Sequence, residues 1–297
     1  MSACQNEGVS ERHLASERIG QFFFETDSGR DRLEYTEYGT GDKWVVLLPA
    51  LLMPRRMHDH LARTLASAGA HVVTLDFLGH GRSDRPDDPF GYSVTSFARQ
   101  VIALLDELGA AQAVIGGTSL GANVALEVAA IAPDRVRSMI LEMPVLDNAL
   151  EVAIVAFAPL LLGARVVPIV FSGIRFLTRR VPRGVVPWWV GIGLDTLDHK
   201  PGPLAAYVHG LFFGRVAPPA SERRRITAPA LVIGHPRDLL HPASDAEMVA
   251  GELPDATLET ATSILEWRRL PERLDLVTTR FVLDSWRPAR RQRRTGS

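Results

Sequence analysis

The segment Gly-Thr-Ser-Leu-Gly at 117–121 constrains this chain more than any other part of the sequence. It follows the short apolar run AVIG at 113–116 and precedes an alanine-rich stretch with helical character. A serine between two glycines at a strand-to-helix turn is typical of a nucleophile elbow, where side chains at Gly117 or Gly121 would collide with neighbouring backbone. The helix that follows points its N-terminus at the turn and favours negative charge there. Ser119 is therefore the candidate nucleophile.

Apolar runs and helical stretches alternate along the rest of the chain. Strands are predicted at 21–25, 32–38, 44–49, 71–76, 113–116, 138–142, 230–234 and 256–261. Helices are predicted at 60–69, 93–108 with Ser93 as its N-cap, from Ser119 to 132, at 244–252 and at 271–283. Buried strands that alternate with helices imply an α/β fold, with a mostly parallel sheet covered by helices on both faces. Ligand sites of such sheets lie at the carboxyl ends of the strands.

The alternation breaks between 145 and 225. This stretch is very apolar, has a helical period and is interrupted by several prolines. We therefore expect a helical cap at 145–225, inserted after the sixth strand at the edge of the sheet where ligands bind. The other boundaries divide the chain into a loosely ordered N-terminal segment (1–19), a core (20–144 and 226–285) and a basic, solvated C-terminal tail (286–297).

Composition narrows the possible partners and the compartment. The 297 residues carry a net charge of −1, so no overall charge draws the chain to nucleic acid. The single cysteine, Cys4, excludes an internal disulfide, and the N-terminal residues contain no apolar signal-peptide core. The apolar stretches are too short to span a membrane, so we expect a cytoplasmic protein without stable membrane insertion. No metal-ligand spacing and no phosphate-binding glycine loop occurs, so no metal and no cofactor is expected.

Two further motifs accompany the elbow in a recognisable order. The segment LDFLGHGRSD at 75–84 contains Asp-x-x-Gly-x-Gly-x-Ser, and APALVIGHPRDLLHP at 228–242 combines a strand with an acidic loop. With the elbow, these motifs resemble the α/β-hydrolase superfamily over roughly 20–285. The resemblance implies the α/β-hydrolase fold with a cap above the site. It also implies that Asp238 is the acidic member of a catalytic triad, although some hydrolases place the acid where Asp147 stands here.

The oxyanion hole departs mildly from this family pattern. Many members have His-Gly after the third strand, where this sequence has Pro49-Ala50. The hole needs backbone N–H groups and not particular side chains. Leu51 (or Ala50) and Leu120, the residue after the nucleophile, can supply them.

The family's catalytic histidine has no counterpart at its usual position. It would stand between the last strand and the last helix, but 257–274 contains no histidine. Glu266 is the only titratable group near that position. We interpret it as a solvated or ion-paired surface glutamate beside Arg268 and Arg269, since a carboxylate is a weak base. His241, three residues after Asp238, is the best substitute base, although this spacing is not the family geometry. The remaining candidates, which carry no sequence signature, are His58, His60, His80, His209 and His235.

The apolar cap suggests the kind of substrate. Its segments 149–177 and 187–200 are rich in aliphatic and aromatic residues, so we expect a small hydrophobic substrate, with His209 and Trp188 as candidate contacts. The first hypothesis is a carboxylesterase-like serine hydrolase of an ester, lactone or thioester. The second is a hydrolase-fold protein that binds an apolar ligand without hydrolysis. A third keeps catalysis but uses the serine only to position a substrate, as in a lyase, isomerase or cofactor-free oxygenase.

Overall fold

The computed structural model shows how much of this organisation the chain adopts. It describes residues 17–26, 29–146, 168–182, 185–186, 190–191, 194–195, 206–207, 209–211, 214–236, 238, 241–263 and 266–287. Asp147, Trp188, position 264 and the tail from 288 onward lie outside the described residues. The sheet begins at Glu17, so the predicted loose segment 1–19 extended three residues too far into the fold.

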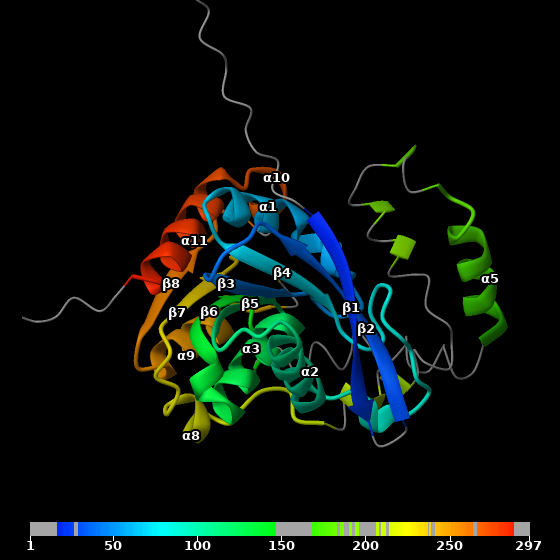
Figure 1. Ribbon diagram of the computed structural model, residues 1–297, viewed down its shortest axis with the longest axis horizontal. Coiled ribbons are helices and arrows are strands. Elements are labelled where there is room, and N and C mark those ends of the chain that lie inside the picture. The colour runs from blue at the N-terminus through cyan, green and yellow to red at the C-terminus, as the bar shows by residue number, and fades with distance from the viewer. Residues whose placement is uncertain are drawn as a thin grey trace, which may run out of the picture.

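An eight-stranded sheet runs through the centre of the molecule, with the strand order β1-β2-β4-β3-β5-β6-β7-β8 (Figure 1). Its strands are β1 Glu17–Thr26, β2 Gly29–Tyr38, β3 Trp44–Leu48, β4 His71–Asp76, β5 Ala113–Thr118, β6 Val136–Glu142, β7 Ala230–Gly234 and β8 Ala256–Thr260. The first two strands pair antiparallel at one edge, and β4 through β8 form a parallel array with β3. This confirms the mostly parallel sheet predicted from the sequence.

Helices cover both faces of this sheet (Figure 1). The α-helices are α1 Asp59–Ser67, α2 Val94–Glu107, α3 Leu120–Ile131, α5 Pro168–Thr178, α8 Ala220–Arg223, α9 Ala243–Glu252, α10 Glu266–Arg269 and α11 Glu272–Ser285, and the 3₁₀ turns are η1 Arg55–His58, η2 Pro89–Gly91 and η3 Pro133–Arg135. One apolar cluster joins the sheet to α2, α3 and α9, and a second joins the opposite face to α1, α10 and α11. As predicted, Ser93 caps α2 by accepting the Ser96 N–H at 3.0 Å.

The Asp-x-x-Gly-x-Gly-x-Ser motif organises the turn after β4. Asp76 is buried, and its carboxylate accepts the Arg55 backbone N–H at 2.6 Å and pairs with the Arg55 guanidinium. Ser83 donates its hydroxyl to the Asp76 carbonyl at 2.6 Å. Gly81 has φ +40°, and a Cβ there would lie 2.1 Å from the Asp76 carboxylate. This motif therefore acts as a structural hub, because a buried carboxylate is stable only with such partners.

The insertion predicted as the cap leaves the sheet after β6 and returns before β7, with α5 and α8 among its described parts. Its two ends meet at one side chain of α3. The Asn123 amide accepts the Val145 N–H at 3.0 Å and donates to the carbonyls of Val145 at 2.7 Å and Val216 at 2.9 Å. Asn123, four positions after Ser119, thus holds both ends of the insertion.

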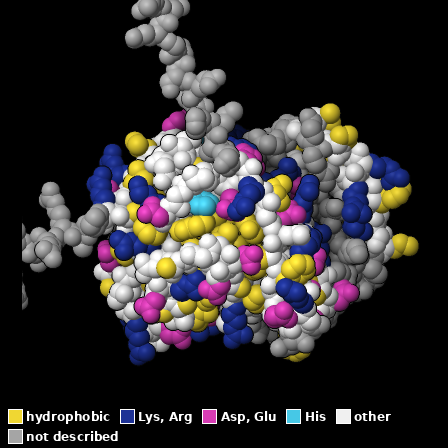
Figure 2. Space-filling view, viewed as in Figure 1, with side chains coloured by type: hydrophobic (Ala, Val, Ile, Leu, Met, Phe, Trp, Pro, Cys, Tyr) yellow, Lys and Arg dark blue, Asp and Glu magenta, His cyan; other side chains and the backbone are white. Residues whose placement is uncertain are grey.

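The face of the molecule drawn in Figure 2 has no large patch of only positive or only negative charge. Acidic and basic side chains are intermixed there (Figure 2). In the part of the chain that the structure describes, no helix is long and apolar enough to cross a membrane.

Candidate active site

The strand-to-helix turn between β5 and α3 has the geometry of a nucleophile elbow. Ser119 has φ 54° and ψ −111°, a conformation that costs a non-glycine residue about 1–3 kcal/mol. A Cβ on Gly117 would lie 2.3 Å from the Gly121 backbone, and one on Gly121 would lie 2.3 Å from the Leu48 carbonyl oxygen. The collisions expected at both glycines are therefore confirmed. The Ser119 N–H donates to the Glu142 carbonyl at 2.8 Å and holds the turn against β6.

Gly121→Ala should disrupt the elbow without removing any polar side chain. The added methyl must displace Leu48 or α3. We therefore expect the free energy of unfolding to fall by about 1–3 kcal/mol and the reactivity of Ser119 to fall at least tenfold. Thermal melting and labelling by a serine-directed probe measure the two effects. Gly251→Ala in α9 is the matched control, since a Cβ there meets nothing within 4 Å. Equal behaviour of the two variants would contradict this account of the turn.

Ser119, His241 and Asp238 lie within hydrogen-bond distance of one another in series. His241 Nε2 is 2.9 Å from Ser119 Oγ, and His241 Nδ1 is 2.9 Å from Asp238 Oδ2. An ionised carboxylate only accepts hydrogen bonds, so Nδ1 carries the proton in the neutral imidazole and Nε2 presents a lone pair to the serine hydroxyl. Ser119 is buried, while the His241 and Asp238 side chains are 20% and 14% exposed. The arrangement can move a proton from the serine to the imidazole.

A local turn allows an acid and a histidine only three residues apart to pair. Asp238 uses its second oxygen, Oδ1, to accept the backbone N–H of His241 at 3.1 Å. Aspartate commonly stabilises a turn in this way. The same carboxylate therefore fixes both the backbone and the ring of His241. Pro242 and α9, which starts at Ala243, follow directly and anchor the loop.

The predicted oxyanion donors lie on two neighbouring loops. Leu120 is the first residue of α3, where an α-helix leaves its N–H without an intrahelical partner. After β3, the Ala50 N–H already points to Met57 Sδ at 3.3 Å, and Leu52 has φ 60°. Of the two candidates on this loop, Leu51 is therefore the better placed to donate. Its role and that of Leu120 stay predictions.

Glu266 is a buried structural carboxylate, so its interpretation as a surface glutamate was wrong. It accepts hydrogen bonds from Arg273 at 2.7 Å and from the Thr262 hydroxyl at 2.9 Å, and its ion-pair partner is Arg273 rather than Arg268 or Arg269. The Arg273 hydrogen bond, with smaller contributions from Thr262, lowers the pKa of Glu266 to about 2. A carboxylate with so low a pKa cannot serve as a general base at neutral pH.

Glu266→Gln should therefore lower stability in a pH-dependent way. The folded state holds the pKa of this carboxylate below its unfolded value, so its stabilisation is complete above about pH 5 and disappears as the pH falls toward 2. Because Arg273 is partly exposed, we expect a loss of about 1 kcal/mol at pH 7. Denaturant titrations of the variant and the wild type at pH 7 and pH 3 measure it. A difference that grows as the pH falls would contradict this assignment.

The other histidines do not reach Ser119 through any contact described. His58 is buried and donates from Nε2 to a backbone carbonyl at 2.9 Å, and burial, with help from Arg268, lowers its pKa to about 4. His80 is buried against Tyr207, and His60 pairs with an aspartate on α11. His209 is half-buried in the insertion, so its contact with substrate stays a prediction.

Glu142, at the end of β6, is a buried charged residue that the sequence reasoning did not identify. Its carboxylate accepts the Thr118 hydroxyl and Arg268 Nη2, the latter at 2.8 Å, and lies 3.2 Å from His235 Nε2. Burial alone raises the pKa of Glu142, but Arg268, His235 and Thr118 together hold it well below its usual range. A glutamate at the end of the apolar run SMILE was the available signal, because a buried charge requires partners.

Comparisons with known proteins agree with this architecture. A sequence model of the alpha/beta hydrolase fold family matches residues 43–167. A candidate non-heme bromoperoxidase of Mycobacterium tuberculosis, BpoC, is 28% identical over 75% of this chain and 86% of its own length. Epoxide hydrolase A of the same organism is 34% identical over 41% of this chain, which spans only 39% of that protein. A crystal structure of a hydrolase from Pseudomonas aeruginosa superposes with a TM-score of 0.69 at 24% identity, covering 88% of this chain and 98% of the other.

The sheet order, the elbow and the family match together define the class. This chain has the α/β-hydrolase fold, and its residues 43–167 are similar to the alpha/beta hydrolase fold family.

Proposed function

We propose that the protein is a serine hydrolase that uses Ser119, His241 and Asp238 as a catalytic triad. The observation that carries the proposal is the 2.9 Å contact between His241 Nε2 and Ser119 Oγ. A serine hydroxyl is a poor nucleophile until a base accepts its proton, and a neutral imidazole in hydrogen-bond reach is suited to that task. The non-hydrolytic reading rested on the absence of such a base.

The chemistry follows the acyl-transfer pattern of other serine triads. His241 accepts the hydroxyl proton while Ser119 attacks the substrate carbonyl, and Asp238 stabilises the imidazolium that forms. The backbone N–H groups of Leu51 and Leu120 hold the developing oxyanion. His241 then protonates the leaving group, and a water molecule activated by the same imidazole cleaves the acyl-enzyme.

The substrate class that we propose is an ester, lactone or thioester with a hydrophobic group. A serine nucleophile forms an acyl intermediate with each of these carbonyl compounds. The apolar composition of 149–177 favours a hydrophobic group in the part of the site below the cap. The relation to epoxide hydrolase A supports hydrolytic chemistry in general but does not fix the substrate.

A fluorophosphonate probe tests the nucleophile directly. We expect the wild type to gain the mass of one probe adduct and Ser119→Ala to gain none. Ser244→Ala, which removes an exposed serine from α9, is the matched control and should label like the wild type. A folded wild-type sample that does not label would contradict the proposal and favour the ligand-binding hypothesis.

A further inference from the structure

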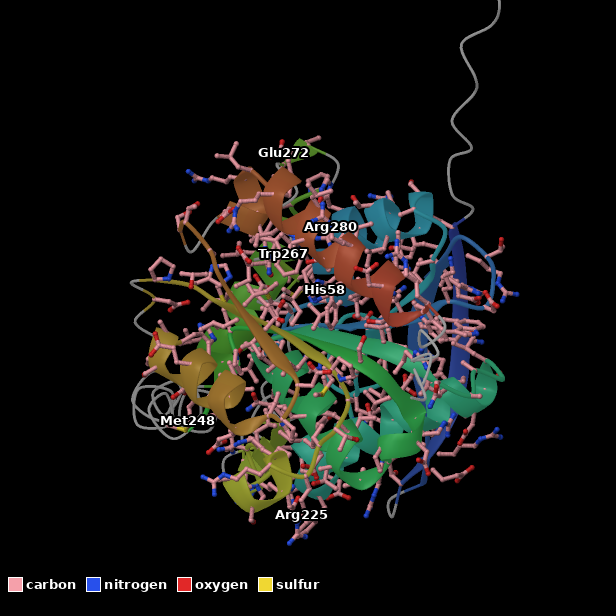
Figure 3. All side chains as sticks on the ribbon, turned by 90° about the vertical axis from the view of Figure 1, so that its left-hand side faces the viewer. His58, Arg225, Met248, Trp267, Glu272 and Arg280 are labelled. Carbon is pink, nitrogen blue, oxygen red and sulfur yellow. The ribbon has the colours of Figure 1, made fainter. Side chains whose placement is uncertain are left out.

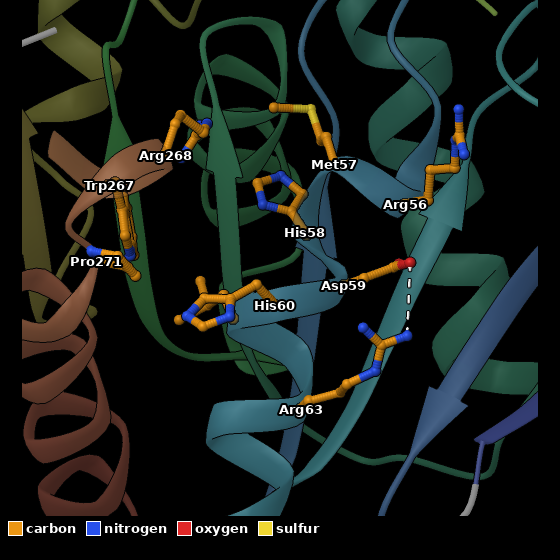
Figure 4. A pocket seen from close by; sticks show the side chains of 10 residues that line it. Arg56, Met57, His58, Asp59, His60, Arg63, Trp267, Arg268 and Pro271 are labelled. Carbon is orange, nitrogen blue, oxygen red and sulfur yellow. Dashed lines mark ion pairs between the residues drawn. The ribbon is translucent and has the colours of Figure 1, made fainter. Parts of the chain in front are cut away.

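We infer that a cavity between α1 and α10 binds the carboxylate of a small apolar acid, with Arg268 as its anchor. The cavity has a volume of about 340 Å³ and lies beside the elbow rather than at Ser119 itself. His58 and Trp267 both line it, and Figure 3 shows them on the side of the sheet that α10 and α11 cover. Arg268 and Met57 lie toward one end of the lining and Arg63 toward the other (Figure 4). The site does not depend on the proposed hydrolysis.

Some N–H groups of Arg268 are available to bind a ligand. Its Nη2 bonds to Glu142 at 2.8 Å and approaches the Thr118 hydroxyl at 3.4 Å. Within the described residues, its Nε and Nη1 groups have no hydrogen-bond partner, and the side chain is 25% exposed where it lines the cavity. A guanidinium has five N–H donors in a planar fork, so it can serve a buried carboxylate on one side and a ligand carboxylate on the other.

The charges of the lining groups favour an anion. Arg56, Arg63 and Arg268 line the cavity, against the single carboxylate of Asp59. Arg56 is paired with Asp195 outside the lining, and Arg63 is paired with a glutamate of β1. The Asp59 carboxylate is already engaged, because it accepts the Tyr38 hydroxyl at 2.8 Å and lies 3.8 Å from Arg63. Arg268 therefore presents N–H groups to the cavity while its ion-pair partner, Glu142, lies outside the lining.

The apolar residues of the lining indicate the size and polarity of the rest of the ligand. Trp267, Met57, Leu61 and Pro271 supply the apolar part of the lining. A volume near 340 Å³ is at the lower end of ligand pockets and suits a molecule of the size of a substituted benzoate. A guanidinium binds carboxylate and phosphate alike, but inorganic phosphate has no apolar body to place against Trp267.

The position of the cavity couples it to the elbow. Arg268 touches Thr118, the residue before Ser119. Met57 accepts the N–H of Ala50, the residue before the predicted oxyanion donor Leu51. Arg268 and Met57 would thus connect a bound carboxylate to the residues that precede Ser119 and Leu51 in the chain.

Titration calorimetry with benzoate tests the inference, with benzamide as the uncharged ligand of equal shape. We expect benzoate to bind the wild type and Ser119→Ala equally, and benzamide to bind at least tenfold more weakly. Equal binding of the two ligands, or no benzoate binding at millimolar concentration, would overturn the proposal. This contrast needs no variant at Arg268, and Ser119→Ala keeps it separate from any failure of the hydrolase function.

Variants of two adjacent arginines on α10 locate the anchor. Arg268→Lys keeps the charge beside Glu142 but loses the fork, so benzoate should bind about tenfold more weakly. Arg269→Lys, at an exposed position outside the lining, should bind within twofold of the wild type. Equal affinities of the two variants would reject Arg268 as the anchor. Displacement of benzoate by an equal concentration of inorganic phosphate would assign the cavity to inorganic anions and reject the carboxylate.

Discussion

Replacing His241 by glutamine is expected to lower kcat for an activated ester by about 10⁴-fold or more. Glutamine can keep a hydrogen bond to Ser119, but it cannot accept the hydroxyl proton near neutral pH. The variant should fold normally, because Asp238 still accepts the backbone N–H of residue 241 and keeps the turn. Steady-state kinetics and probe labelling measure the loss, and a thermal melt confirms that the fold is intact.

The control for this variant removes a histidine from the amino-terminal end of a strand, whereas the candidate site lies at the carboxyl ends. His71→Gln changes the first residue of β4, where the ring stacks on Trp44 and pairs with Glu37. It should keep full activity even if it melts a few degrees earlier. If His241→Gln labels at the wild-type rate, the base is another group, and the proposed triad is wrong.

The sequence allowed most of the fold to be predicted, for a physical reason. Strands buried on both faces read as continuous apolar runs, so 71–76 and 230–234 were located to the residue. The elbow was also readable, because two glycines are needed where a Cβ would meet backbone at 2.3 Å. The edge strand β1 was less clear, since exposed side chains gave its first residues a polar character.

The candidate site was harder to predict, because its geometry depends on loops. Nothing in the spacing of Asp238 and His241 shows that one carboxylate can hold both the backbone and the ring of the histidine. The burial of Glu266 was missed because its partner, Arg273, lies seven residues away across a turn. Glu142 and Arg268 are 126 residues apart, so only the folded chain shows that they form a buried pair.

These contacts suggest how the chain arranges its polar groups without a histidine after β8. The segment 266–273 carries Glu266, Arg268 and Arg273, and each of them takes part in a buried or half-buried ion pair. That segment therefore stabilises the elbow and the last helix. The acid and the base we propose lie together on the loop after β7, where two hydrogen bonds join them.

Asp238→Asn is expected to lower kcat by about 10³- to 10⁴-fold while leaving the turn intact. The amide oxygen can still accept the His241 backbone N–H, which Asp238 Oδ1 now accepts at 3.1 Å. The amide nitrogen, however, would donate to Nδ1 of the ring. The imidazole would then carry its proton on Nε2, pointing at Ser119, and could not accept the hydroxyl proton.

The comparison with two further variants separates this tautomer effect from a loss of structure. Asp134→Asn, at an exposed position in η3, should match the wild type in both activity and melting. Asp238→Ala should lose activity and also loosen the loop, since it removes both hydrogen bonds to His241. Kinetics and hydrogen exchange at the backbone amides of His241 and Ala243 distinguish the two cases. If Asp238→Asn stays within tenfold of the wild type, the carboxylate does not set the state of the imidazole, and another group must orient the base.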